Sequence, residues 1–234
     1  MNINWKYLWD NFVNQMFVLE GYKTVLEGLK NTLIIAFGGF ALGLVIGTLL
    51  AIMQLLPDNK LTKVLKSFSK LYVGLFRGTP IVVQLLVGWY VIKPMLGITQ
   101  ASALMWGLVI FGMNSGAYVS EIIRGGILSV DRGQMEAGRS LGLSYATTML
   151  RIVMPQAIKN SLPSIGNELI AIVKETSVAG FVSVTDLYVA FKLQDTAYNP
   201  LICYLALAVV YIILVVIFTV VIKLIEKRLA RNER

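Results

Sequence analysis

Long apolar stretches without a charged residue dominate the pattern of the chain. Three of them run for 27 residues each, over 31–57, 94–120 and 196–222. At about 1.5 Å per residue, a helix of this length crosses the hydrocarbon layer of a bilayer, which is about 30 Å thick. A buried helix of a soluble protein seldom runs uninterrupted for so long. The pattern therefore predicts three membrane spans.

Two further stretches contain charged residues and are still interpreted as spans. The first, over about 72–92, is interrupted by Arg77, and the second, over about 152–173, contains Lys159 and Glu168. With them, the pattern predicts an all-α polytopic membrane protein with five transmembrane helices in a single domain of residues 1–234. The expected spans are 28–56, 72–92, 98–120, 152–173 and 199–223.

The composition agrees with a membrane protein and excludes several classes of function. Charged residues make up 15% of the chain, against roughly 25% in typical soluble proteins. The chain has no histidine and one cysteine, which excludes a Ser-His-Asp triad, an H-E-x-x-H zinc motif and an intrachain disulfide. It also lacks a G-x-x-x-x-G-K-[ST] motif, so we expect no nucleotide site, metal or cofactor in this chain.

The chain has a net charge of +8, and its basic residues are concentrated in particular loops. This distribution indicates how the chain is oriented in the membrane rather than a site for nucleic acid. Lysine and arginine together number five in residues 57–77 and four in 121–151, but one in 93–97. Because cytoplasmic loops carry the excess of basic residues, we expect 57–77, 121–151 and the C-terminus in the cytoplasm and the N-terminus outside. Aromatic residues within 1–27 predict a segment lying at the membrane interface.

The loop over 124–151 carries the signals of two short helices. Asp131 predicts the start of a helix over 132–141 that ends at Gly142, where a glycine can adopt a positive φ. Ser144 would then cap a second helix. The alternative is an amphipathic helix that rests on lipid headgroups.

The same loop resembles the EAA motif of ATP-binding-cassette (ABC) importer permeases. That motif reads E-A-A, three residues, G, nine residues and I-x-L-P, and it is matched here by Glu136-Ala137-Gly138, Gly142, Ile152 and Met154-Pro155. Every spacing agrees, and the two departures are Gly138 for alanine and Met154 for leucine. Other segments look like the polar amino-acid uptake branch of the family: Arg77-Gly78-Thr79-Pro80, Asn114-Ser115-Gly116-Ala117-Tyr118 and Gly166-Asn167-Glu168.

The resemblance implies a type I importer permease in the cytoplasmic (inner) membrane of a bacterium. Two permease chains, either copies or relatives, would pair among the membrane lipids. Each would bind one cytoplasmic ATPase that holds ATP and Mg²⁺, while an extracytoplasmic binding protein delivers an amino acid. The chain itself would be no enzyme. The ATPase would contact a coupling helix, whose residues here are Glu136, Ala137, Gly138, Arg139, Leu141 and Gly142.

Polar residues recur along the fourth predicted span. Asn160, Ser164 and Asn167 share one helical face, and Glu168 is next to it. Polar groups inside a span are costly and usually face a bundle interior or a water-filled path, so we expect these residues to line the substrate path. The alternative is that they hold helices together by hydrogen bonds. The expected path also includes three residues of neighbouring spans, for which packing is the alternative: Gln84, Asn114 and Tyr118.

Two smaller patterns concern how the helices pack. Glu121 lies three residues before Arg124, so an ion pair between them is the simplest role for this carboxylate. Gly43 and Gly47 form a G-x-x-x-G pattern, which permits two helices to approach closely. The sequence leaves open whether the second helix belongs to the same chain or to a partner.

Two other classes of function compete with an importer subunit. An ion-coupled secondary transporter or channel would need inverted repeats or more buried carboxylates, and the sequence shows neither. For an intramembrane enzyme, the sequence lacks histidine and a cysteine cluster that could hold a metal. Co-purification of an ATPase with the chain would separate these classes.

Overall fold

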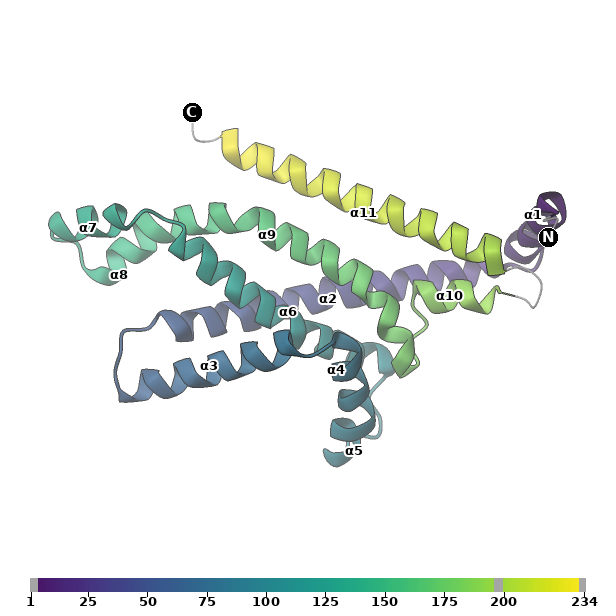
Figure 1. The fold of residues 1–234 in the computed structure, drawn as a ribbon, viewed down its shortest axis with the longest axis horizontal. Coiled ribbons are helices and arrows are strands. Elements are labelled where there is room, and N and C mark those ends of the chain that lie inside the picture. Colours follow the sequence, from purple (N-terminus) through teal and green to yellow (C-terminus); the bar gives the residue numbers. More distant parts are fainter. Residues whose placement is uncertain (1–3, 196–199, 232–234) are drawn as a thin grey trace. The chain divides into compact units, whose positions relative to one another are not determined.

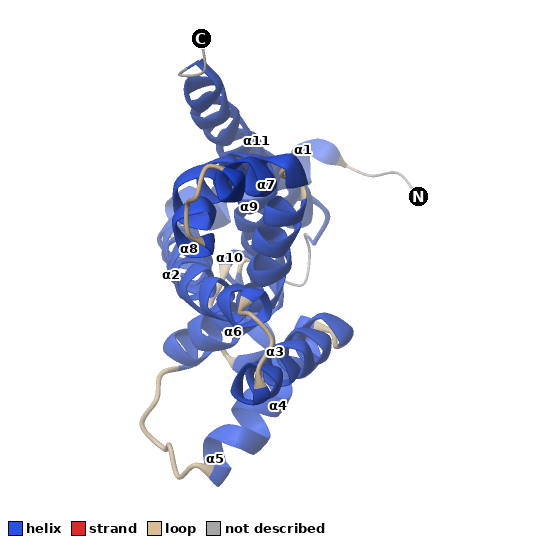
Figure 2. Ribbon diagram, turned by 90° about the vertical axis from the view of Figure 1, so that its left-hand side faces the viewer, coloured by secondary structure: helices blue, strands red, loops and turns tan. Residues whose placement is uncertain are grey.

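The computed structural model describes residues 4–195 and 200–231. In this part of the chain every regular element is a helix, as predicted (Figure 2). The residues gather in two compact units: the first takes its residues from 1–39, 80–111 and 170–218, and the second from 40–79, 112–169 and 219–234. Several long helices pass from one unit into the other. The single domain expected from the sequence stays a prediction.

Figure 1 labels the helices in chain order. First come α1 (Trp5–Val13) and a π-helical turn (Asn14–Val18). The long helices are α2 (Gly21–Leu55), α3 (Lys60–Gly78), α6 (Ala103–Leu128), α9 (Met154–Glu175) and α11 (Pro200–Arg231). The short ones are α4 (Ile81–Val87), α5 (Lys93–Met95), α7 (Arg132–Ser140), α8 (Tyr145–Thr148) and α10 (Leu187–Leu193). Two further π-helical turns (Gly88–Ile92 and Met149–Val153) and a 3₁₀ turn (Thr176–Val182) complete the chain.

Three helices of the described residues are long and apolar enough to cross a membrane: α2, α6 and α11. A fourth span results if α3 and the helical segment Ile81–Met95 are counted as one bent pair. α9 is not among the candidates, although its 22 residues are sufficient in length. The count of five spans therefore stays a prediction. Asn199, where the fifth expected span begins, lies outside the described residues.

The span expected over 72–92 differs most from the structure. Instead of one helix, α3 ends at Gly78 and a new helix begins at Ile81, with Thr79 and Pro80 in extended backbone between them. Proline lacks an N–H and drives the preceding residue out of the helical region. Charge and apolar length alone predict one continuous helix here, and the break becomes predictable only when Pro80 is given weight.

In the second unit, glycines allow α2 and α6 to pack closely. A Cβ atom placed on Gly43 would lie 2.7 Å from the Ser115 side chain, and one placed on Gly47 would lie 2.6 Å from that of Val119. A Cβ atom on Gly116 of α6 would likewise lie 2.6 Å from an isoleucine side chain of α2. The G-x-x-x-G pattern therefore serves a helix pair within the chain.

α3 packs beside the C-terminal part of α2 in the same unit (Figure 1). The Ser69 hydroxyl donates a hydrogen bond of 3.0 Å to the backbone oxygen of Leu50, and the Gln54 amide donates one of 3.0 Å to Ser69 Oγ. The Tyr72 hydroxyl donates a 2.8 Å bond to the backbone oxygen of Met113 in α6. One face of α3 is thus fixed to both helices. The buried apolar residues of this contact are Leu50, Val73, Phe76 and Ala117.

In the first unit, the N-terminal part of α2 packs against the segment that precedes α10. The Asn31 amide donates a 2.9 Å hydrogen bond to the backbone oxygen of Thr185, and the backbone N–H of Leu187 donates one of 3.1 Å to Thr32 Oγ1. Gly28 makes this approach possible, because a Cβ atom there would lie 2.7 Å from the backbone oxygen of Asp186.

The N-terminal segment belongs to the same unit. Met16 is buried with residues of α10 and α11 in one apolar core, whereas Trp5, Trp9 and Phe17 remain more than half exposed. Exposed aromatic side chains of this kind suit a membrane–water interface. The interfacial location of residues 1–27 stays a prediction, and residues 1–3 lie outside the described part.

Candidate functional site

The loop between α6 and α9 forms the two short helices that the sequence predicted. The Asp131 side chain accepts a 2.6 Å hydrogen bond from the backbone N–H of Gly133 and caps α7. α7 ends at Ser140, and Gly142 has a φ of +81°, a conformation that favours glycine. The Ser144 hydroxyl then caps α8 by accepting a 3.1 Å bond from the N–H of Thr147. The loop is therefore a pair of capped helices joined by a tight turn.

Gly138 fixes the distance between α7 and α8, which lie side by side in the second unit (Figure 1). It is buried, and a Cβ atom on it would lie 2.5 Å from Thr148 Cγ2. The Thr148 hydroxyl donates a 3.0 Å bond to the backbone oxygen of Ser144, which holds its side chain in place. The departure of Gly138 from the EAA motif thus has a steric reason.

The outer surface of α7 carries charged residues, and an apolar residue protrudes at the turn that follows it. Glu136, Ala137 and Arg139 are exposed, and Arg139 also donates a 2.7 Å hydrogen bond to the backbone oxygen of Leu143. Leu141, at the turn, is 81% exposed. This surface is uncovered in the single chain, as a docking surface for another protein would be.

α9 carries the polar residues that the sequence placed on one face. The helix continues through Pro163, so Asn160, Ser164 and Asn167 keep their helical spacing, and all three are exposed. The Asn160 amide donates a 2.8 Å hydrogen bond to Ser129 Oγ near the end of α6. Glu168 lies beside this face and is partly buried.

Pro163 and Gly166 have separate effects on α9. Pro163 has no N–H and therefore cannot donate the usual helical hydrogen bond to the preceding turn of α9. Gly166 is a packing residue, because a Cβ atom on it would lie 2.5 Å from Ile222 Cγ2 of α11. The small side chain therefore lets α11 approach α9 within the second unit.

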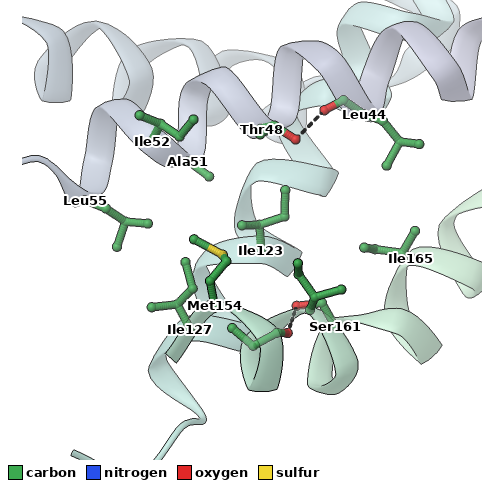
Figure 3. A pocket seen from close by; sticks show the side chains of 12 residues that line it. Leu44, Thr48, Ala51, Ile52, Leu55, Ile123, Ile127, Met154, Ser161 and Ile165 are labelled. Carbon is green, nitrogen blue, oxygen red and sulfur yellow. Dashed lines mark hydrogen bonds between the residues drawn. The ribbon is translucent and has the colours of Figure 1, made fainter. Parts of the chain in front are cut away.

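Another face of α9 borders an apolar cavity that the sequence did not reveal (Figure 3). Its volume is about 270 Å³, and residues of α2, α6 and α9 line it. The two hydroxyls that reach it, of Thr48 and Ser161, donate to the backbone oxygens of Leu44 and Ala157 in their own helices. The cavity thus offers little to a zwitterionic ligand, and the polar face of α9 is the better candidate.

The remaining predicted path residues lie in different surroundings. Asn114 is buried, and its amide donates a 3.4 Å hydrogen bond to the backbone oxygen of Phe76 at the end of α3. This contact favours the packing alternative for Asn114. Tyr118 is 37% exposed. Gln84 is half-buried in α4, which belongs to the first unit, whereas the other six predicted residues belong to the second.

An ion cluster joins the end of α3 to α6. Glu121 accepts hydrogen bonds of 3.0 and 2.8 Å from the Arg124 guanidinium, which confirms the predicted pair. Arg77 Nη1 lies 3.4 Å from the same carboxylate, and its guanidinium lies 5.4 Å from the centroid of the Tyr118 ring. The contact between Arg77 and Glu121 is not predictable from the sequence, because spacing along one helix cannot reveal a partner on another.

Known proteins resemble this chain over almost its whole length. Residues 43–231 match the family described as "Binding-protein-dependent transport system inner membrane component". The chain is 38% identical over 228 residues to the putative glutamine transport system permease protein GlnP of Rickettsia typhi, covering 97% of this chain and 99% of that protein. It is 34% identical over 210 residues to the arginine transport system permease protein ArtQ of Bacillus subtilis, covering 89% and 94%. The crystal structure of an amino acid ABC transporter with histidines matches with a TM-score of 0.83 at 31% identity, covering 97% and 100%.

Proposed function

The chain belongs to the family of binding-protein-dependent transport system inner membrane components, and we propose that it is the permease subunit of an ATP-driven importer for polar amino acids. Relatives named for glutamine and arginine transport support this substrate class. ATP hydrolysis belongs to a separate ATPase subunit, so the chain is a transporter component and no enzyme.

The polar face of α9 is the observation that carries the proposal. It presents Asn160, Ser164 and Asn167 to the outside of the chain along a helix of 22 residues, or about 33 Å. The Asn160 amide already bonds to Ser129. The Ser164 hydroxyl and the Asn167 amide facing hydrocarbon would lack the hydrogen bonds that water provides, at a cost of several kcal/mol. A helix with such a face in a membrane protein therefore borders a water-filled path or a second chain.

The substrate would meet this face about halfway across the membrane. Asn160, Ser164 and Asn167 would supply neutral hydrogen bonds to the amino acid, and Glu168 would attract its ammonium group or a cationic side chain. Tyr118 of α6, in the same unit, would extend the path. A second permease chain, either a copy or a relative, would close the path on its other side.

Coupling to ATP hydrolysis would pass through α7. Its exposed residues Glu136, Ala137 and Arg139 and the protruding Leu141 would enter a groove on the cytoplasmic ATPase, and Gly138 and Gly142 would keep the helix pair rigid. This requires the loop and the C-terminus in the cytoplasm and the N-terminus outside, as the basic residues predict. An extracytoplasmic binding protein would deliver the amino acid from the other side.

Uptake into proteoliposomes tests the proposal. The complete transporter is reconstituted into vesicles with its ATPase and binding protein, and radiolabelled amino acids are added outside. One set of vesicles contains ATP, and a second set has an ion gradient across the membrane but no ATP. We expect uptake of polar amino acids that requires ATP and the binding protein. Uptake driven by the gradient without ATP would instead support the secondary-transporter alternative.

Replacement of Glu168 by glutamine tests the substrate role. Because a hydrogen bond to a charged group contributes about 1.5–3 kcal/mol, Glu168→Gln should reduce uptake of a cationic amino acid by about 10- to 100-fold and that of a neutral one less. The size-exclusion profile of the purified complex should not change. Equal loss for both substrates would assign Glu168 to the ammonium group that both carry. A collapsed profile would assign it a structural role, and unchanged uptake with an unchanged profile would remove it from the path.

A further inference from the structure

α3 has three distinct faces. The first face is the one fixed to α2 and α6, and its buried residues are Thr62, Ser69, Val73 and Phe76. The second, here called the lysine face, carries Lys63, Lys66 and Lys70, with Lys60 near its start and Arg77 near its end. The third, here called the apolar stripe, consists of Leu61, Val64, Phe68, Leu71 and Leu75.

The apolar stripe is open in this chain. Its five side chains are between 54% and 71% exposed, and they follow one another at alternating intervals of three and four residues along the helix. Each such side chain gains roughly 1.5–3 kcal/mol from leaving water. A continuous stripe of this kind therefore has an apolar neighbour in the membrane.

The lysine face adds a strong positive charge to the same helix. α3 contains five basic residues and no acidic residue. The Asp58 carboxylate just before it pairs with Lys66, whose hydrogen bond and charge hold the pKa of Asp58 below its usual value. Lys60, Lys63 and Lys70 remain exposed. Three cations thus accompany the stripe over about three helical turns.

This charge argues against a second copy of the chain as the neighbour of the stripe. A symmetric contact between two copies of α3 would bring two sets of lysines together, and like charges across an interface cost several kcal/mol. An anionic phospholipid satisfies both faces at once, because its acyl chains are apolar and its headgroup is negative. Basic clusters just cytoplasmic of a span attract such lipids.

We propose that α3 binds anionic phospholipids of the cytoplasmic leaflet, with acyl chains along the apolar stripe and phosphate groups at Lys60, Lys63 and Lys70. The proposal rests on the cytoplasmic location of residues 57–77 and is independent of which amino acid is transported. Each basic residue near an anionic membrane surface increases affinity by about fivefold. The three lysines should therefore produce a clear preference for anionic over zwitterionic lipid.

Fluorescence quenching by brominated lipids measures this preference directly. Phe68→Trp places a reporter in the stripe of the complete transporter, and the signal of the four native tryptophans is subtracted with the wild-type protein. Leu71→Trp serves as a second reporter should the first variant not assemble. We expect brominated phosphatidylglycerol to quench the reporter at a mole fraction at least about fivefold lower than brominated phosphatidylcholine does.

Matched lysine variants test whether the positive charge of these lysines causes the preference for anionic lipid. The triple replacement Lys60→Gln, Lys63→Gln and Lys70→Gln should abolish the preference, whereas Lys60→Arg, Lys63→Arg and Lys70→Arg should retain it. Equal quenching by both lipids, or a preference that survives the glutamine triple, overturns the proposal. A reporter that neither lipid quenches also overturns it, since protein rather than lipid then covers the stripe.

Discussion

A single methyl group separates Gly138 from the alanine that the EAA motif has at this place. The structure leaves no room for it, because Thr148 Cγ2 occupies the site where the methyl group would lie. Gly125 in α6 offers the opposite case, with open space around the same hypothetical atom. The two glycines therefore form a matched pair for measuring the tightness of the α7–α8 contact.

We predict that Gly138→Ala lowers the stability of the purified complex, by about 1–3 kcal/mol as for other overpacked sites. Thr148→Ser removes the methyl group that makes the closest contact, while Thr148 Oγ1 at 3.0 Å and Ile152 Cδ1 at 3.1 Å remain, so it should restore part of this loss in the double variant. Gly125→Ala should be neutral or stabilising by up to about 1 kcal/mol. Thermal unfolding in detergent checks all three. Equal effects at both glycines would contradict the steric explanation.

Asp186 predicts a pH dependence in the first unit. It lies between α9 and α11, outside the candidate spans, and its side chain is fully buried while it caps α10. Burial raises its pKa to about 6 from an ordinary value of 3.8. Since the folded state then binds the proton more tightly than the unfolded state, stability should rise as pH falls from 7 towards 5.

Asp186→Asn should remove this dependence, because the amide keeps a capping oxygen but does not titrate in this range. The melting temperature of the wild-type protein should be higher at pH 5 than at pH 7, and that of the variant should change less. A variant that keeps the full wild-type dependence would show that other groups titrate.

Among the elements, α7 is the most predictable from the sequence. The break between α3 and α4 is the least predictable. Asp131, Gly142 and Ser144 are local signals, and the structure uses each of them as predicted. The break depends on Pro80, whose effect is equally local but was outweighed by the apolar residues on both sides. The packing of Gly43 on Ser115 could not be predicted, because no local signal says which helix lies opposite a small residue.

α7 also carries the coupling prediction. Glu136→Lys should leave the permease in the membrane but reduce substrate-stimulated ATP hydrolysis by more than about tenfold, since a reversed charge at a docking surface costs several kcal/mol. Glu226→Lys makes the same change of charge near the end of α11 and should have little effect. Comparable losses in both variants would mean that charge as such, rather than docking of α7, is responsible.

For the whole molecule, the sequence predicted the helical fold and the family, and it could not predict how the path closes. The exposed faces of α9 and α11 in one chain are those that lipid, ATPase or a second permease would cover. Of the candidate path residues, Ser164 and Asn167 are exposed, and Asn160 is exposed but also bonds to Ser129 of α6. Asn114 is buried and bonds to Phe76 of α3. The spacing of polar residues along the sequence identifies the polar face of a helix such as α9, but it cannot identify what lies against that face.

Cysteine accessibility along α9 tests the central claim most directly. Cys203→Ser removes the only cysteine of the chain, and Asn160→Cys, Asn167→Cys and Ile158→Cys then place single thiols on one helix. Ile158 is the matched control, because it is 54% exposed in the chain but apolar and borders the cavity. A charged, membrane-impermeant thiosulfonate should modify positions 160 and 167 of the assembled transporter rapidly, with protection by substrate, and position 158 slowly. Equal modification at all three positions, or none at 160 and 167, would contradict the assignment of this face to the transport path.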